Sequence, residues 1–152
     1  MVINEDILVR IIRDVIEEQA GALPRDAGAP RWKDASGVIG IDPTRIPTED
    51  FPFPIESPPS SVRLVDVVSL EESPRLGCGI MEMDHTSFEW TLKYDEIDYV
   101  IEGTLELIMD GRPVRAEKGQ ILFIPKNTTL RFSTPDTARF LYVCYPANWA
   151  DQ

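Results

Sequence analysis

The sequence predicts an all-β barrel or sandwich preceded by a short amphipathic helix. From Ser61 onward, short runs of β-forming residues follow one another at even spacing, with turn-forming residues between them. Asp110-Gly111 separates two of these runs and is a strong signal for a two-residue hairpin. An apolar stripe at helical spacing lies near the N-terminus. With 152 residues, the chain has room for one core of ordinary size and an appendage.

The first segment, residues 1–19, is expected to contain a helix over Asn4–Gln19. Asn4 can cap this helix, and Glu5 and Asp6 place negative charge in its first turn, where the helix dipole favours it. Its apolar face consists of Ile7, Leu8, Ile11, Ile12, Val15 and Ile16. Because an isolated helix of this length is marginal in water, its apolar face needs a partner. An external partner is favoured over the chain's own barrel, because a spacer follows the helix.

That spacer, residues 20–36, contains several Gly and Pro residues and few large apolar side chains, which is typical of a flexible linker. Residues 37–152 are assigned to the barrel. They begin with a proline-rich extended arm that reaches Ser60, with a candidate edge strand at Val38–Ile41. Beyond the arm, strands are expected at 62–68, 76–83, 88–92, 97–102, 104–109, 112–117, 121–124, 129–133 and 139–145.

The composition predicts a globular protein without a nucleic-acid or membrane partner. A formal net charge of −11 disfavours binding to nucleic-acid phosphates, which requires a basic face. No apolar run approaches the roughly 20 residues that cross a bilayer. Because no secretion signal is recognised, we expect a cytoplasmic protein. Cys78 and Cys144 are accordingly interpreted as two free thiols, with a disulfide as the alternative.

Two spaced motifs narrow the fold to one kind of barrel. Glu96 is followed after six residues by Gly103, and Gly119 is followed after five residues by Pro125. This framework resembles the two metal-site motifs of the cupins, which are single double-stranded β-helix (jelly-roll) barrels. The histidine positions of those motifs instead hold Trp90, Leu92 and Leu130. The resemblance therefore implies a cupin barrel without the usual imidazole ligands.

The interior of this barrel is the candidate site. Since alternate side chains of a strand face the same side, Asp98 is expected to point inward beside Glu96. Two carboxylates in an apolar cavity repel one another and are poorly solvated, which raises at least one pKa and produces a general acid or base. Alternatively, both accept hydrogen bonds and only order the barrel. Tyr94 is a further candidate catalytic residue, as a donor to a substrate oxygen. Candidate substrate contacts are Trp90, Leu92, Lys93, Lys126, Leu130 and Arg131.

A transition-metal centre is not expected, because such centres in this fold use imidazole ligands. His85 is the only histidine of the sequence, and it lies in a polar turn. A magnesium ion held by Glu96 and Asp98 is the alternative, since Mg²⁺ needs few protein ligands. We expect no tightly bound cofactor.

Three segments carry a closer family resemblance. They are WTLKYDEIDYVIEG at 90–103, FIPK at 123–126 and RFLYVCYPANW at 139–149. In these segments the chain resembles the ethanolamine-utilisation EutQ family, over roughly residues 66–149. The resemblance implies a homodimer associated with bacterial microcompartments. It also implies an acetate kinase activity that uses ATP and magnesium.

The N-terminal helix resembles the encapsulation peptides that recruit cargo, so shell proteins or cargo enzymes are its implied partners. The rival interpretation is a non-catalytic cargo, assembly or small-molecule-binding cupin of the microcompartment. It is supported by the net charge of −11 and by the lack of a recognisable phosphate-binding loop, since phosphoryl transfer depends on neutralising phosphate charge. The sequence leaves ethanolamine, choline and diol pathways open.

Overall fold

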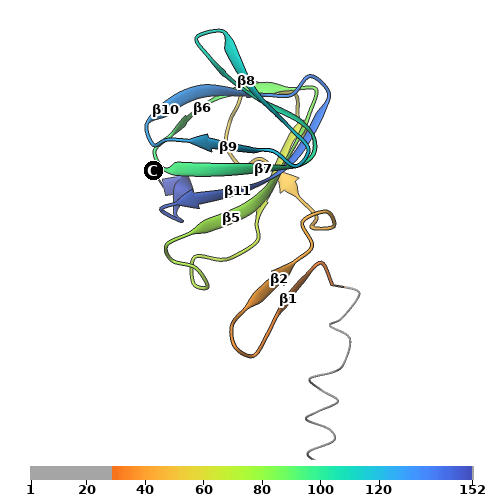
Figure 1. Ribbon diagram of the computed structural model, residues 1–152, viewed down its shortest axis with the longest axis vertical. Coiled ribbons are helices and arrows are strands. Elements are labelled where there is room, and N and C mark those ends of the chain that lie inside the picture. Colours follow the sequence, from red (N-terminus) through yellow and green to blue (C-terminus); the bar gives the residue numbers. More distant parts are fainter. Residues whose placement is uncertain (1–28, 152) are drawn as a thin grey trace, which may run out of the picture. The chain divides into compact units, whose positions relative to one another are not determined.

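The computed structural model of the chain describes residues 29–151 (Figure 1). This part is all-β, as predicted, with one short 3-10 turn. Its elements are β1 (Arg31–Lys33), β2 (Ile39–Ile41), β3 (Glu49–Asp50), β4 (Val62–Asp66), β5 (Gly77–Asp84), β6 (Ser87–Leu92), β7 (Asp95–Met109), β8 (Arg112–Glu117), β9 (Ile121–Ile124), β10 (Thr128–Ser133), β11 (Thr137–Tyr145) and η1 (Trp149–Asp151). None of the helices in this range is long and apolar enough to cross a membrane. The predicted N-terminal helix and its apolar face lie outside the described residues.

β1 and β2 form a separate two-stranded sheet. Trp32 of β1 packs against Gly40 of β2 so closely that a Cβ atom at Gly40 would lie 2.1 Å from the indole ring. Gly37 lies between the strands with a φ of +91°, a conformation that glycine adopts without strain. A strand is therefore present near Ile39, as predicted, and it pairs with β1 in this separate sheet. The flexible linker predicted over 20–36 does not extend across Arg31–Lys33, because these residues pair as a strand.

The barrel consists of two sheets that share β7. The larger sheet has the order β3-β4-β5-β11-β7-β9, and the smaller sheet has the order β6-β10-β7-β8. β7 runs from one sheet into the other (Figure 1). Gly103 lies within β7 with a φ of +75°, and a Cβ atom there would lie 1.9 Å from the Thr137 carbonyl oxygen. We predicted two strands on either side of Gly103. They form one continuous strand, because a glycine can bend without interrupting the pairing.

The predicted hairpin at Asp110-Gly111 joins β7 to β8. Both residues have positive φ, +50° and +74°, which is the conformation of a type I′ turn. Met109 and Arg112 pair directly across this turn. The prediction of a two-residue hairpin is therefore confirmed.

Alternation along β7 determines which of its side chains face the barrel interior. Glu96, Asp98 and Val100 are buried, whereas Ile97 and Tyr99 between them are exposed. The interior core takes apolar side chains from both sheets, including Met83, Phe88, Leu92, Leu105, Ile124, Leu130, Phe132 and Phe140. A second apolar cluster consists of Ile46, Val67, Ile80 and Ile101.

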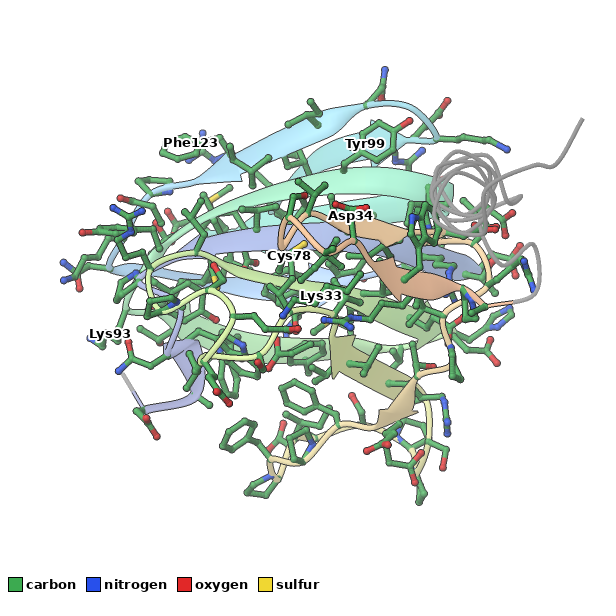
Figure 2. All side chains as sticks on the ribbon, turned by 90° about the horizontal axis from the view of Figure 1, so that it is seen from below. Lys33, Asp34, Cys78, Lys93, Tyr99 and Phe123 are labelled. Carbon is green, nitrogen blue, oxygen red and sulfur yellow. The ribbon has the colours of Figure 1, made fainter. Side chains whose placement is uncertain are left out.

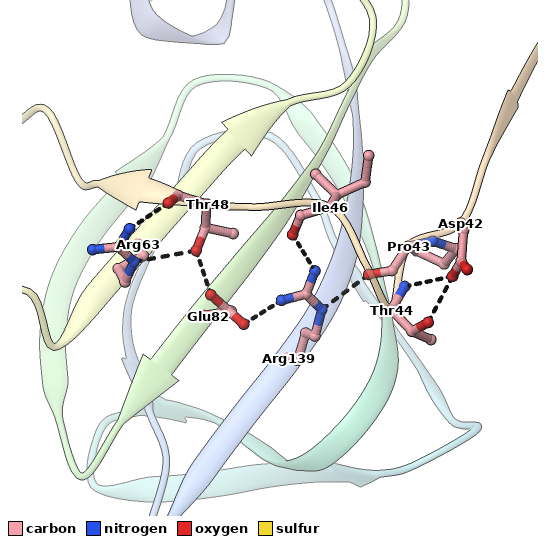
Figure 3. Close-up of polar contacts among 8 residues, drawn as sticks. All are labelled: Asp42, Pro43, Thr44, Ile46, Thr48, Arg63, Glu82 and Arg139. Carbon is pink, nitrogen blue, oxygen red and sulfur yellow. Dashed lines mark hydrogen bonds and ion pairs between the residues drawn. The ribbon is translucent and has the colours of Figure 1, made fainter. Parts of the chain in front are cut away.

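A polar clasp fixes the start of the arm to the barrel (Figure 3). The guanidinium of Arg139 on β11 donates to the carbonyl oxygens of Pro43, at 2.9 Å, and Ile46, at 2.7 Å. It also forms an ion pair with Glu82 on β5, and the Thr48 hydroxyl donates to the same carboxylate. A side chain of β11 therefore holds an arm that lies more than ninety residues earlier in the chain.

Candidate functional site

A small cavity of about 20 Å³ lies inside the barrel and is partly open to solvent. Its wall is mostly aromatic and is formed by Phe51, Met81, Phe88, Trp90, Tyr94, Glu96, Phe132, Phe140, Tyr142 and Trp149. The rings pack against one another, with centroid distances of 5.5 Å between Phe51 and Trp90 and 6.4 Å between Tyr94 and Trp149. A cavity of this volume holds about one water molecule.

Two inward-facing carboxyl groups of β7 interact with one another, and one of them, Glu96, borders this cavity. Glu96 forms part of the wall and is 6% exposed, and Asp98, two residues further along the strand, is fully buried. Neither oxygen of Asp98 has a hydrogen-bond donor among the described residues. Ionised carboxylates can only accept hydrogen bonds, so the two groups can bond to each other only when the pair holds a proton.

The pKa values of Glu96 and Asp98 are both raised, which favours a protonated pair. Burial raises the pKa of Glu96 to about 8. Burial also raises the pKa of Asp98, and the negative charge of the neighbouring Glu96 raises it further. The pair therefore holds at least one proton at neutral pH and can act as a proton donor or acceptor.

The two tyrosines of the wall use their hydroxyl protons differently. Tyr142 donates to Asp66 at 2.6 Å, and the Trp149 indole donates to the same carboxylate oxygen at 3.2 Å. The Tyr94 hydroxyl instead accepts a hydrogen bond from the Trp90 indole at 3.1 Å. Burial raises the pKa of both tyrosines, so both keep their protons. Tyr94 can therefore still donate its own proton to a group in the cavity.

The structure brings three of the predicted site residues to the cavity wall: Trp90, Tyr94 and Glu96. Leu92 and Leu130 are buried in the interior core, on paired strands, without lining the cavity. Leu130 pairs directly with Trp90. Packed apolar side chains therefore fill the positions where the cupin motifs carry histidine.

Three predicted substrate contacts do not line the cavity: Lys93, Lys126 and Arg131. Both lysines are exposed, and Lys93 lies at the periphery of the barrel (Figure 2). Arg131 follows the buried Leu130 on β10 and is directed to the opposite face, where its guanidinium approaches the Ser87 carbonyl oxygen at 3.4 Å. The alternation that places Leu130 inside therefore places Arg131 outside.

Sequence reasoning missed most of the aromatic wall, including Phe51, Tyr142 and Trp149. Tyr142 could have been found, because the apolar alternation along β11 places it on the same face as Phe140. Phe51 belongs to the arm, which has no periodic pattern. Trp149 lies at the C-terminal end and contacts Phe53 of the arm, with a centroid distance of 5.8 Å.

Glu96 and Asp98 do not fit a magnesium ion. They supply two carboxylates, whereas Mg²⁺ requires six oxygen ligands in near-octahedral geometry, and the cavity has room for about one water. Within residues 29–151, no group of three His, Cys, Asp or Glu side chains is arranged to hold a metal. His85 is exposed and contacts Asp84 at 2.6 Å and Asp136 at 3.3 Å, away from the cavity wall.

Comparison with known proteins decides the family. The model of the family described as ethanolamine utilisation protein EutQ matches residues 3–151. The chain belongs to the EutQ family. A protein of Clostridioides difficile (strain 630) named acetate kinase EutQ is 48% identical over 151 residues, which are 99% of this chain and 96% of that protein. A protein of the same name from Salmonella typhimurium (strain LT2) is 33% identical over 96% of this chain, which spans 63% of that protein.

Solved structures of the EutQ family have the same barrel. The Clostridium difficile EutQ protein superimposes with a TM-score of 0.70 and 48% identity, over 80% of this chain and 90% of that one. The putative ethanolamine utilisation protein from Salmonella typhimurium LT2 has a TM-score of 0.68 and 36% identity, over 78% and 94%. A Cupin_2 domain from Enterobacter cloacae shares 14% identity and a TM-score of 0.50, over 56% and 96%, which supports the cupin fold alone.

Proposed function

We propose that this EutQ-family chain is an acetate kinase of ethanolamine utilisation, which forms acetyl phosphate and ADP from acetate and ATP. The observation that carries the proposal is the 48% identity to the Clostridioides difficile protein of that name, over 99% of this chain. A shared fold alone would not support a shared activity. A match along nearly the whole of both chains supports it much better.

The barrel interior does not itself fit ATP with its magnesium ion. The cavity has room for about one water, and its charged wall residue is an acid. A wider pocket of about 270 Å³ contains Arg63 and Arg139. Their guanidinium groups already donate to Asp50, Thr48 and Glu82 and to arm carbonyl groups. Because phosphoryl transfer needs cations that are free to contact phosphate, we assign no step of it to these residues.

The cavity favours a second candidate function, a small-molecule-binding cupin without phosphoryl transfer. The specific observation is an aromatic wall that includes one buried carboxyl group, that of Glu96, with the predicted cationic contacts Lys93, Lys126 and Arg131 outside it. Such a cavity, largely apolar with few polar groups, is typical of a small-ligand site.

The decisive experiment measures acetyl phosphate formed from acetate and Mg·ATP by the purified protein, with the Clostridioides difficile relative assayed in parallel. Turnover by both proteins is the expected result. Turnover by the relative alone, at equal protein concentration, would contradict the kinase proposal. If both proteins turn over, Glu96→Gln and Asp98→Asn then locate the chemistry, with Glu89→Gln as an exposed control. If acetyl phosphate formation is lost in Glu96→Gln and Asp98→Asn but kept in Glu89→Gln, the reaction takes place in the barrel.

We further propose that residues 1–19 recruit the chain to a bacterial microcompartment in the cytoplasm, by docking their apolar face on a shell protein or cargo enzyme. The support is the sequence pattern alone, since these residues lie outside the described range. Ile11→Glu with Val15→Glu should release the protein from sedimenting microcompartments. Arg13→Glu changes the net charge by the same amount on the polar face. This control variant should remain with the microcompartments. Co-sedimentation of the doubly substituted protein would contradict this proposal.

A homodimer is a further proposal, supported by an exposed apolar face on the outside of the larger sheet. Neighbouring strands β7 and β9 place Ile97 beside Phe123 and Tyr99 beside Ile121, and all four are at least 40% exposed. Tyr99 and Phe123 lie on the same outer side of the barrel (Figure 2). Contiguous exposed apolar side chains of this kind mark protein interaction surfaces. Phe123→Lys should convert a dimer to a monomer in light scattering, and an unchanged mass would exclude this face.

A further inference from the structure

We propose that residues 146–151, which follow β11, form a lid over Glu96 that opens without unfolding of the barrel. With the lid closed, the cavity beside Glu96 measures about 20 Å³ and has room for about one water molecule. Withdrawal of the lid would admit a small molecule to the same carboxyl group. The proposal concerns access to the barrel interior and does not depend on which reaction takes place there.

The lid covers the end of β11 that lies beside Glu96. Cys144 of β11 pairs directly with Glu96 of β7, and both side chains are buried on the inner face of the sheet. Further along the chain, Trp149 forms part of the same cavity wall as Glu96 and keeps only 9% of its surface exposed. The lid therefore shields the strand pair that carries the acidic group.

Ala147 extends this cover over Cys144. It is buried against Gly77 of β5, whose lack of a Cβ atom allows the close approach. A Cβ atom at Gly77 would lie 2.5 Å from the Cys144 sulfur and 3.2 Å from the Ala147 carbonyl oxygen. Burial also raises the pKa of the Cys144 thiol to about 12, so this thiol is unreactive while the lid is closed.

The polar anchor of Trp149 is one that water can replace. Its indole donates a hydrogen bond of 3.2 Å to the carboxylate of Asp66, which is exposed. Tyr142 donates to the same oxygen at 2.6 Å, so this part of the wall keeps its own hydrogen bond when Trp149 leaves. Because solvent then reaches both the indole and Asp66, opening leaves neither of them without a hydrogen-bond partner.

The other contacts of the Trp149 ring are made at the ring edges. The centroid distances are 5.8 Å to Phe53, 6.2 Å to Tyr142 and 6.4 Å to Tyr94, with interplanar angles between 62° and 79°. Residues 146–151 add no strand to either sheet of the barrel. A segment that packs through side chains outside the strand ladders opens at a lower free energy than the core strands do.

The arm also borders the cavity, but it is fastened more firmly. The main-chain N–H of Phe51 donates to the Val62 carbonyl oxygen at 3.1 Å, directly after the paired strand β3. The clasp of Arg139 fixes the start of the same arm. We therefore assign the opening to residues 146–151.

Reaction of Cys144 with an aromatic disulfide reagent (DTNB) reports opening of the lid. Cys78→Ser leaves Cys144 as the only thiol of the full chain, and its labelling rate is measured over a series of urea concentrations. The reagent is much larger than the cavity, so it reacts only with an open form. Opening of the lid predicts a rate that is constant at low urea and faster than global unfolding allows. A labelling rate that follows global unfolding at every urea concentration would overturn the proposal.

Substitutions in the same background then locate the opening. Asp66→Ala should raise the constant rate at low urea by at least about 10-fold, the usual contribution of a hydrogen bond to a charged group. Asp66→Asn keeps an acceptor oxygen and should have a smaller effect, and Glu89→Ala, at an exposed position, should have none. An unchanged rate in Asp66→Ala would refute the role of Trp149. A rate that rises only in Arg139→Met would place the opening in the arm and refute the lid.

Two features keep this test decisive. If the Cys78→Ser chain does not fold, mass spectrometry of the peptide that contains Cys144 gives the same rates in the wild-type chain. The measurements use neither ATP nor acetate, so a negative result leaves the kinase proposal untouched.

Discussion

Replacement of Glu96 by Gln is expected to remove much of the pH dependence that the buried pair gives to the stability of the barrel. Because burial raises the pKa of Glu96 from 4.5 to about 8, the folded state keeps a proton that the unfolded chain releases within this range. This stabilisation is complete below pH 4.5 and is lost as the pH rises towards 8. For one group with this shift, the free energy of unfolding falls by about 3 kcal/mol between about pH 5.5 and pH 8.

Urea unfolding of the wild-type chain and Glu96→Gln at a series of pH values measures this loss. The decrease over that pH range should be smaller by about 3 kcal/mol in the variant, with the remainder due to Asp98 and exposed groups. Glu89→Gln changes an exposed glutamate and should retain the wild-type slope. Parallel curves for the wild type and Glu96→Gln would refute the reasoning, because Glu96 would then be ionised in the folded state at about pH 5.5.

Three further substitutions test how β7 and the arm build the site, each by urea unfolding. Gly103→Ala should cost at least about 3 kcal/mol, from backbone strain and overlap with the Thr137 carbonyl oxygen. Gly111→Ala, which has a similar φ but open space around it, should cost about 1 kcal/mol, and equal costs would mean that overlap contributes nothing. Arg139→Met should cost about 2 kcal/mol, because two arm carbonyl groups lose their guanidinium donor and Glu82 loses its ion pair while keeping the Thr48 hydroxyl as a donor. Arg112→Met, at an exposed position, should be neutral. Phe51→Ala, half-buried against Trp90, should cost about 2 kcal/mol and increase acrylamide quenching of tryptophan fluorescence; unchanged quenching would show that the arm does not shield the cavity.

The barrel could be predicted from the sequence because its signals are local. Alternation of apolar and polar residues along β7 placed Glu96 and Asp98 on the inner face, and the structure buries both. Asp110-Gly111 determined a turn that only residues tolerant of positive φ can form. The prediction that one strand ends at Gly103 and another begins after it was wrong, because β7 continues through this residue. A sequence does not distinguish a glycine that ends a strand from one that bends it.

The wall of the cavity could be predicted only in part, because some of it depends on contacts between distant segments. Phe51 lines the cavity because the arm brings it there, and the Arg139 clasp holds the start of that arm. No periodic pattern in the sequence predicts this contact between distant segments. Lys93 and Lys126 were predicted to contact substrate, and they lie near Glu96 and Pro125 in the sequence. Nearness in sequence does not decide which way a side chain points, and both lysines are exposed.

The place of β11 in the larger sheet has a consequence for how this chain is made. β11 lies between β5 and β7, although it follows both in chain order, and it pairs with each along most of its length. A ribosome therefore releases β5 and β7 before the strand that joins them exists, and Arg139 is not yet present to hold the arm. Pairing between segments so far apart in sequence is slow, and unpaired strand edges aggregate readily. Until β11 is synthesised, the nascent chain therefore lacks the strand that pairs with both β5 and β7 in the finished barrel.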